Sequence, residues 1–163
     1  MKRTVTTILL IGLFVTGMTG CRSTSIEDPH IPSIFLEASS SAPGSDNPYI
    51  TLPVSGTQLR IYGKPLFGPL DIIRIEMVQV DRGLAVRYLL TPSASRELMR
   101  STGDNVGYAF IFFDNESPIG ARRIDGMIED GILYTFLEVP DEKLPELVNE
   151  MNRTLVEFRR KNR

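Results

Sequence analysis

Two residue types that often carry chemistry occur once each in this chain, as Cys21 and His30. The thiol of Cys21 is the stronger nucleophile near neutral pH. A single cysteine excludes an internal disulfide framework and a metal site built from several cysteines. His30 lies between Pro29 and Pro32, where a lone imidazole is expected to be solvated. A catalytic triad that used His30 would require this Pro-rich stretch to fold back over the domain.

Common catalytic motifs are absent from the sequence. It contains no Gly-x-Ser-x-Gly, no Gly-rich phosphate loop and no His-Glu-x-x-His. The carboxylates of Asp125, Glu129 and Asp130 are close together in the sequence and could hold a hard cation such as Ca²⁺. Because Asp125-Gly126 and Asp130-Gly131 are typical of turns, a solvated turn is the favoured interpretation. We therefore expect no catalytic residue, no metal and no cofactor, and we predict that the protein is not an enzyme.

The pair Arg122 and Arg123 falls in a predicted strand, so the two side chains point to opposite faces of the sheet. One of them must then face the core side or pair with an acidic neighbour such as Glu138. A structural ion pair is the favoured interpretation, ahead of a binding role.

The N-terminal stretch has the pattern of a secretory signal. Lys2 and Arg3 precede Thr4–Gly20, which carries no charge and is most apolar over Ile8–Val15. This apolar part is too short for a membrane span and is followed by small residues, as in a signal peptide. We expect residues 1–20 to be a signal peptide that is removed.

The residues Met18-Thr19-Gly20-Cys21 resemble the processing site of bacterial lipoproteins. The resemblance implies that the Cys21 thiol receives a diacylglycerol and that the chain is cut before it. Two or three acyl chains, at about 0.8 kcal/mol per buried CH₂, would hold the protein firmly on a membrane. Residues 21–31 would then be a tether on the periplasmic side of the envelope. Since Arg22 replaces the Asp that retains such proteins at the inner membrane, the resemblance favours the outer membrane.

The composition is that of an ordinary globular domain. The chain has 163 residues, of which 42% are apolar and 23% are charged. Without Lys2 and Arg3, 16 of the 18 basic residues remain against 20 acidic residues, a net charge of about −4. This balance argues against a nucleic-acid partner, which would require a basic face.

Apolar patterning predicts a series of short strands and one helix before residue 140. The apolar residues alternate within 72–90, with Asp81-Arg82-Gly83 as a turn, which predicts a hairpin. The alternation changes phase between Met77 and Val78, where we expect a bulge. Thr91 and Pro92 predict a helix start, with Ala94 and Leu98 on its apolar face and Gly103 or Gly107 at its end. Further strands are expected at 33–37, 49–53, 58–62, 108–113, 119–124 and 132–139, and 108–113 is apolar on both faces, as in a central strand.

The last segment predicts an amphipathic helix. Its apolar residues recur at helical spacing: Leu144, Leu147, Val148, Met151, Leu155 and Phe158. Acidic residues stand at its start and basic residues at its end, which complements the helix dipole. The predicted fold is therefore α+β, a single domain over residues 32–163 with an antiparallel sheet and two packed helices.

Residues of the central region resemble the head subdomain of the first large periplasmic domain of SecD, an accessory protein of the export translocase. The matching residues are a Leu-Thr-Pro helix start and a Thr-x-x-Asn-x-Gly stretch: Leu90, Thr91, Pro92, Thr102, Asn105 and Gly107. The resemblance covers roughly residues 70–152. It implies a fold and contact with polypeptide at the outer face of a membrane. It does not imply transport or proton coupling, because this sequence lacks the spans that carry them. We expect the Thr91–Gly107 motif to be structural.

These features predict a lipid-anchored, non-enzymatic envelope protein that binds other envelope proteins or exported polypeptides. Edge strands of its sheet could accept an extended chain by strand addition. Two alternatives stay open: an envelope hydrolase that uses paired carboxylates, and a purely structural lipoprotein. A cleft with two converging carboxylates, one with a raised pKa, would favour the hydrolase.

Overall fold

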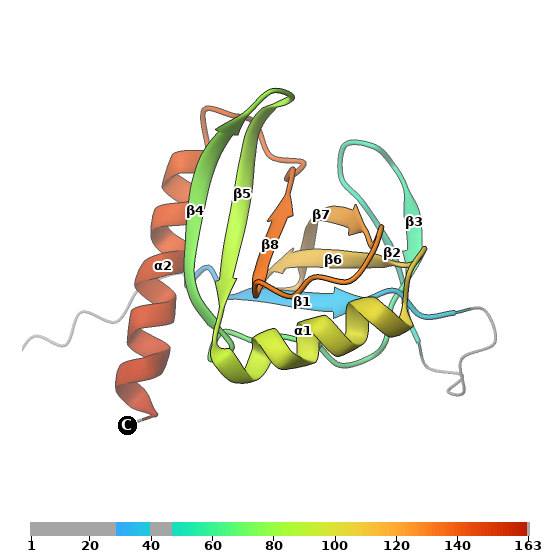
Figure 1. Cartoon of the computed structure of the whole chain (residues 1–163). Coiled ribbons are helices and arrows are strands. Elements are labelled where there is room, and N and C mark those ends of the chain that lie inside the picture. Colours follow the sequence, from blue (N-terminus) through green and yellow to red (C-terminus); the bar gives the residue numbers. More distant parts are fainter. Residues whose placement is uncertain (1–28, 40–46, 163) are drawn as a thin grey trace, which may run out of the picture.

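The computed structural model describes residues 29–39 and 47–162. They form eight strands and two helices, so the predicted α+β class is confirmed. The strands divide among three antiparallel sheets, where the sequence suggested one. The elements are β1 (Pro32–Leu36), β2 (Tyr49–Thr51), β3 (Gln58–Arg60), β4 (Ile72–Val80), β5 (Gly83–Leu90), α1 (Pro92–Asp104), β6 (Ala109–Asp114), β7 (Ser117–Arg123), β8 (Ile132–Thr135) and α2 (Leu144–Lys161) (Figure 1).

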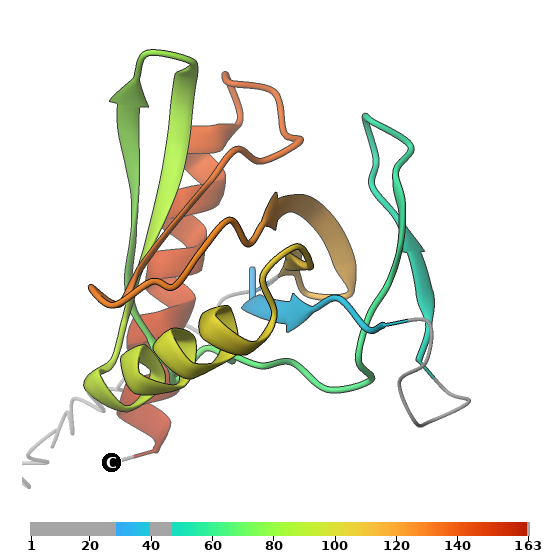
Figure 2. The same ribbon diagram turned by 45° about the vertical axis from the view of Figure 1, so that its right-hand side comes forward.

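Strand β6 is the centre of the sheet β1-β6-β7 and is covered on both sides. Phe110 and Phe112 join the main core, whereas Ile111 and Phe113 join a smaller cluster that includes residues of the β2–β3 hairpin. The prediction of a central strand is therefore confirmed. The β2–β3 hairpin stands to one side of this sheet (Figure 2).

The second three-stranded sheet has the order β4-β5-β8 and contains the predicted hairpin. Its bulge lies between Ile72 and Arg74, so the predicted bulge at Met77 and Val78 is wrong. Met77 and Val80 are more than a third exposed, because this end of the hairpin extends beyond the core. At this end of the hairpin the apolar residues are not sorted by contact with the core. The change in their alternation at Met77 and Val78 therefore does not mark a bulge.

Helix α1 begins as its sequence predicts. The Thr91 hydroxyl accepts from the backbone N–H of Ala94 at 3.3 Å, and Ala94 and Leu98 are buried. The helix ends at Asp104, between the two glycines expected to end it. Gly103 lies in its last turn, where an added Cβ would be 3.1 Å from the Met127 side chain.

Helix α2 buries the apolar stripe and also covers part of the edge of β4. Met151 and Leu155 are completely buried, whereas Leu147 is half-buried against the core. The Asn152 amide donates to the Ile75 carbonyl at 2.7 Å and accepts from the Ile75 N–H at 3.0 Å, as a neighbouring strand would. Arg159 donates to the Ile73 carbonyl at 2.8 Å. The side chains of α2 thus satisfy backbone groups on this outer edge.

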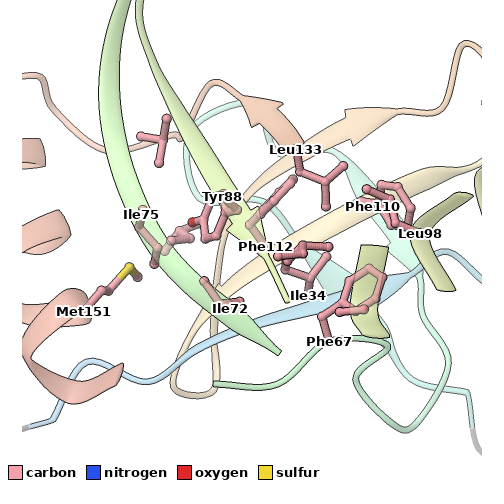
Figure 3. Packing of buried hydrophobic residues seen from close by; sticks show 14 of the residues in the cluster. Ile34, Phe67, Ile72, Ile75, Tyr88, Leu98, Phe110, Phe112, Leu133 and Met151 are labelled. Atoms are coloured by element: carbon pink, nitrogen blue, oxygen red, sulfur yellow. The ribbon is translucent and has the colours of Figure 1, made fainter. Parts of the chain in front are cut away.

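The main core lies between the two three-stranded sheets and the two helices. Tyr88 is fully buried beside Phe112, with ring centroids 5.0 Å apart (Figure 3). Burial raises the pKa of Tyr88, and the negative charge of Asp114 adds to the shift. Because its pKa is raised, Tyr88 is a neutral phenol inside the core. Among the described residues its hydroxyl has no hydrogen-bond partner.

The segment before β1 is attached to the β6–β7 turn. His30 Nδ1 lies 2.6 Å from Asp114 Oδ2, and Asn115 exchanges hydrogen bonds with the backbone of Ile31. The expectation that His30 is simply solvated is therefore wrong. This contact could not be predicted from local sequence, because Asp114 is 84 residues away.

Three predicted strands are shorter in the structure. Strands β2 and β3 end at Thr51 and Arg60, and β8 ends at Thr135 because the following residues leave β5 and approach β7. In the part of the chain that the structure describes, no helix is long and apolar enough to cross a membrane.

We predict that Met151→Ala lowers the free energy of unfolding by roughly 2–5 kcal/mol, because it removes a completely buried side chain. Leu147→Ala should cost less, since Leu147 is only half-buried. Urea unfolding measures both. Val156→Ala is the matched control on the same helix, because Val156 is 61% exposed and its truncation should change stability little. Equal effects of Met151→Ala and Val156→Ala would contradict the packing of α2.

Candidate functional site

The residues of the Thr-x-x-Asn-x-Gly stretch hold α1 to the loop that follows β7. Thr102 is completely buried, and its hydroxyl lies 2.7 Å from the Leu98 carbonyl. The same oxygen accepts from the backbone N–H of Ile128 at 2.9 Å. This bond ties the loop over residues 124–131 to the helix.

Asn105 and Gly107 form the corner between α1 and β6. The Asn105 amide donates to the Ser101 carbonyl at 2.8 Å, which satisfies a group at the helix end. Gly107 has φ +93°, a conformation that disfavours any side chain, and its N–H donates to Ile124 at 2.9 Å. The polar groups of this motif therefore form hydrogen bonds with backbone groups of the same domain. Together with Thr91 and Pro92 they position α1, β6 and the 124–131 loop.

A second glycine fixes the other end of this loop. Gly131 has φ +72°, and an added Cβ would lie 2.1 Å from the Ser95 hydroxyl on α1. The loop is thus held at Ile128 and at Gly131, and it leads directly into β8.

The chain that follows β8 contacts β7, and the two strands separate from there. A Cβ on Gly120 would lie 3.0 Å from the Phe136 carbonyl oxygen and 3.1 Å from the Leu137 side chain. Next to this contact, Glu138 donates its N–H to the Ile119 carbonyl at 2.7 Å. In Figure 1, β8 lies on the side of β5 that faces β7.

A cleft opens between the separating strands. Its first hollow has a volume of about 390 Å³, and a second of similar volume shares Arg122 and Tyr134 with it. The first is lined by Val80, Arg82 and Ala85 from the β4–β5 hairpin, by Ala121 and Arg122 from β7, and by Asp125, Tyr134, Thr135 and Phe136. The second continues along Met127, Ile128, Glu129, Asp130 and Ile132. We refer to the two hollows together as the β7–β8 cleft.

Backbone groups of both strands face the β7–β8 cleft. The Tyr134 carbonyl accepts from the Arg122 guanidinium at 2.9 Å, so it points away from β5. Because the N–H and C=O of one residue in an antiparallel strand point the same way, the Tyr134 N–H also faces the cleft. The Ile119 carbonyl bonds Glu138 on the outer side of β7, so Ala121, two residues on, presents its backbone groups there too.

Apolar side chains stand exposed around these edges. Tyr134 is 38% exposed, Phe136 46% and Met127 58%. Nothing in the local sequence marks these three residues as functional. Alternation within 132–139 places Tyr134 and Phe136 on one face, but it cannot distinguish a solvent-facing aromatic residue from a core residue.

The expected ion pair between an arginine of β7 and Glu138 is not formed. Arg122 binds the Tyr134 carbonyl, whereas the Glu138 carboxylate accepts from the backbone N–H groups of Val54 and Ser55 at 2.8 and 3.0 Å. Partial burial acts to raise the pKa of Glu138, but the hydrogen bonds from Ser55 and Val54 together outweigh it and lower the pKa. The Glu138 carboxylate therefore binds the turn of the β2–β3 hairpin.

The three carboxylates considered for a cation do not form one site. Asp125 lines the first hollow, and Glu129 and Asp130 line the second. The Asp130 carboxylate accepts from the Ile132 N–H at 3.0 Å, as in a turn. Within residues 29–39 and 47–162, no three metal-ligating side chains converge. Cys21, the predicted lipidation site, lies outside the described residues.

No protein-family model matches the chain, and no curated protein matches its sequence. Two solved structures of SecDF resemble its fold. One is a crystal structure of SecDF in the super-membrane-facing form, with 14% identity, a TM-score of 0.55, and coverage of 76% of this chain and 18% of that chain. The other is described as a membrane component SecDF that enhances protein export, with 14% identity, a TM-score of 0.56, and coverage of 77% of this chain and 63% of that chain.

At this level of identity the likeness establishes the fold alone. The chain has a SecD-head-like fold, as the resemblance of its central region implied. It spans less than two thirds of the length of either SecDF chain.

We predict that Gly107→Ala lowers the free energy of unfolding by about 1 kcal/mol or more, because alanine is strained at φ +93°. Thermal or urea unfolding measures the loss. Gly63→Ala is the matched control, since no atom lies within 4 Å of its added Cβ and its φ is outside the left-handed region. If Gly107→Ala is as stable as Gly63→Ala, the corner does not constrain the fold.

Proposed function

We propose that this protein is a lipid-anchored, non-enzymatic protein of the cell envelope whose domain binds extended polypeptide in the β7–β8 cleft. Cys21 carries the anchor, and residues 21–31 connect it to the domain on the periplasmic side, at the outer membrane. Its partners are exported polypeptides or other envelope proteins.

The observation that carries this proposal is the pair of strand edges that face each other across the cleft. The backbone groups of Tyr134 and Ala121 point into it, and exposed aromatic side chains flank it. An unpaired strand edge binds an extended chain through main-chain hydrogen bonds, and neighbouring hollows accept its side chains. This arrangement supports binding of many sequences, because the main chain is common to all of them.

The likeness to SecDF supports a link to protein export. One of the two similar proteins is described as a component that enhances protein export. We infer that the SecD-head-like domain of this chain serves export or envelope assembly from a lipid anchor.

The hydrolase alternative requires a carboxyl group with a raised pKa next to a second carboxylate. The Glu97 pKa is lowered chiefly by its hydrogen bond with Arg100, and the Glu138 pKa is also lowered, which is the opposite of what a general acid requires. These two groups therefore give that alternative no support.

Tyr134→Pro tests the cleft. Proline removes the Tyr134 N–H, which faces the cleft, and leaves the ladder to β5 intact, so an edge strand should tolerate it. With a fluorescently labelled, permanently unfolded polypeptide, we expect anisotropy to show binding at least about threefold weaker than for Tyr134→Ala, since one net hydrogen bond is worth about 1 kcal/mol.

Tyr134→Ala is the matched control, because it loses the same side chain and keeps the N–H. A melting temperature for each variant separates binding from folding. Equal affinity of the two variants at equal stability would refute strand addition at β8.

Cys21→Ser tests the anchor. The serine hydroxyl cannot replace the thiol as the acyl acceptor, so we expect the variant to lose both fatty-acid label and membrane fractionation. Recovery in the membrane fraction after a high-salt wash would show that Cys21 is not the anchor.

A further inference from the structure

The two ends of α2 carry opposite charges. Three exposed acidic residues stand at its start: Asp141, Glu142 and Glu146. Residues 159–163 include four basic residues, and of these Arg160 and Lys161 are exposed and form no ion pair with another described residue. Glu157 is the one acidic residue in the last two turns of the helix. Because a helix C-terminus carries only about half a negative charge, the helix dipole balances a fraction of this basic run.

The first residues of β4 lie against this basic end. Arg159 donates to the Ile73 carbonyl at 2.8 Å, which joins the last turns of α2 to the start of β4. Ile73 and Leu70 are each more than a third exposed. The Arg74 side chain is also largely exposed, although its guanidinium lies 3.4 Å from the Glu76 carboxylate. We define the basic face by five exposed residues: Leu70, Ile73, Arg74, Arg160 and Lys161.

The basic face combines two kinds of side chain that suit the surface of a bilayer. Lysine and arginine are attracted to anionic lipid headgroups, and each contributes when it lies close to the surface. Apolar side chains beside them can enter the boundary between headgroups and acyl chains. Charge complementarity therefore favours an anionic membrane as the occupant of this face.

We propose that the basic face binds an anionic membrane surface and thereby sets the orientation of the lipid-anchored domain. Arg74, Arg160 and Lys161 contact lipid phosphates, and Leu70 and Ile73 enter the headgroup region. This inference rests on the proposed function, because the anchor holds the domain at the membrane. It adds the class of lipid and the face of the domain that meets it.

The length of the tether is compatible with this placement. His30 lines a hollow together with Glu146 and Leu147, near the start of α2. Along the helix axis Arg160 lies about 21 Å beyond Glu146, at 1.5 Å per residue. The chain from Cys21 to His30 spans at most about 30 Å when it is extended. The anchor can therefore reach a membrane plane at the basic face, and it keeps the domain close to that plane.

Docking on the basic face directs the β7–β8 cleft away from the membrane. The C-terminal end of α2 and the start of β4 lie at one end of the molecule, and the β4–β5 turn lies at the other (Figures 1 and 2). The nine residues of β4 span about 26 Å between these ends. Val80 and Arg82, beside the turn, line the first hollow of the cleft. The acidic start of α2 favours the same orientation, because an anionic surface repels it.

Fluorescence quenching in vesicles tests this orientation. The lipidated chain is placed in vesicles of phosphatidylcholine with phosphatidylglycerol, or of phosphatidylcholine alone, each with a nitroxide-headgroup lipid as quencher. A fluorophore is attached at Asn162→Cys, next to the basic face, or at Asp81→Cys in the β4–β5 turn. In low salt we expect quenching at residue 162 on the anionic vesicles, weaker quenching there on phosphatidylcholine, and none at residue 81 on either. High salt should remove the difference between the two vesicle types, because it screens exposed charges.

A charge variant identifies the residues responsible. Arg160→Gln with Lys161→Gln should lower the ratio of docked to undocked protein at least about fivefold, since one basic residue near an anionic surface is worth about that factor. Lys143→Gln with Arg123→Gln is the matched control, which removes the same charge at exposed positions outside the basic face. It should change the ratio by less than about twofold. Melting temperatures check that both double variants are folded.

The outcomes separate this inference from the proposed function. Equal quenching of the two labels, equal quenching at residue 162 on both vesicle types, or equal effects of the two double variants would refute docking on the basic face and leave the lipid anchor in place. If the unmodified chain carries no acyl label, the proposed anchor fails, and flotation of the Cys21→Ser chain with the anionic vesicles decides. Flotation that Arg160→Gln with Lys161→Gln weakens supports the basic face, and absence of flotation refutes it.

Discussion

The close contact of Gly120 with the chain after β8 is the constraint on which the arrangement of the two larger sheets depends. A Cβ at this position would lie 3.0 Å from a backbone oxygen, which cannot move aside as a flexible side chain can. With glycine there, β7 and the segment after β8 approach closely enough for the bond between Glu138 and Ile119. Because the strands are joined at this one end only, they separate along their length, and the cleft follows from that separation.

Two other sheet edges are at least partly covered, each in a different way. The outer edge of β1 bonds the chain at residues 62–67, through Ile34 and Leu36. The outer edge of β4 is covered near Ile75 by Asn152 from α2. Open strand edges can pair non-specifically with other chains, and covering these two edges limits such pairing. The β7–β8 cleft combines a strand edge, exposed aromatic residues and an arginine that donates to the Tyr134 carbonyl on that edge.

The Thr-x-x-Asn-x-Gly motif and the cleft belong to one structural unit. Thr102 is hydrogen-bonded to Ile128 and Gly107 to Ile124, so the motif sets the position of the loop that lines the second hollow of the cleft. Both hydrogen bonds are made with backbone groups of this loop. The residues that resemble SecD therefore position the helix, strand and loop around them. This is a structural role, as distinct from direct contact with a partner.

Local sequence determined the elements whose signals lie within a few residues of each other. The Thr91 cap, the β4–β5 turn, the stripe of α2 and the two-faced apolar strand β6 were all predictable, because capping, turns and apolar periodicity act over short distances. Tertiary structure alone decided the contacts between distant residues: His30 with Asp114, Asn152 with the edge of β4, and Glu138 with the β2–β3 turn. It also decided that the strands form three sheets and that Tyr134 and Phe136 face solvent. Alternation specifies that a side chain lies on one face of a strand, but only the packing of the whole chain determines whether that face meets the core or an open cleft.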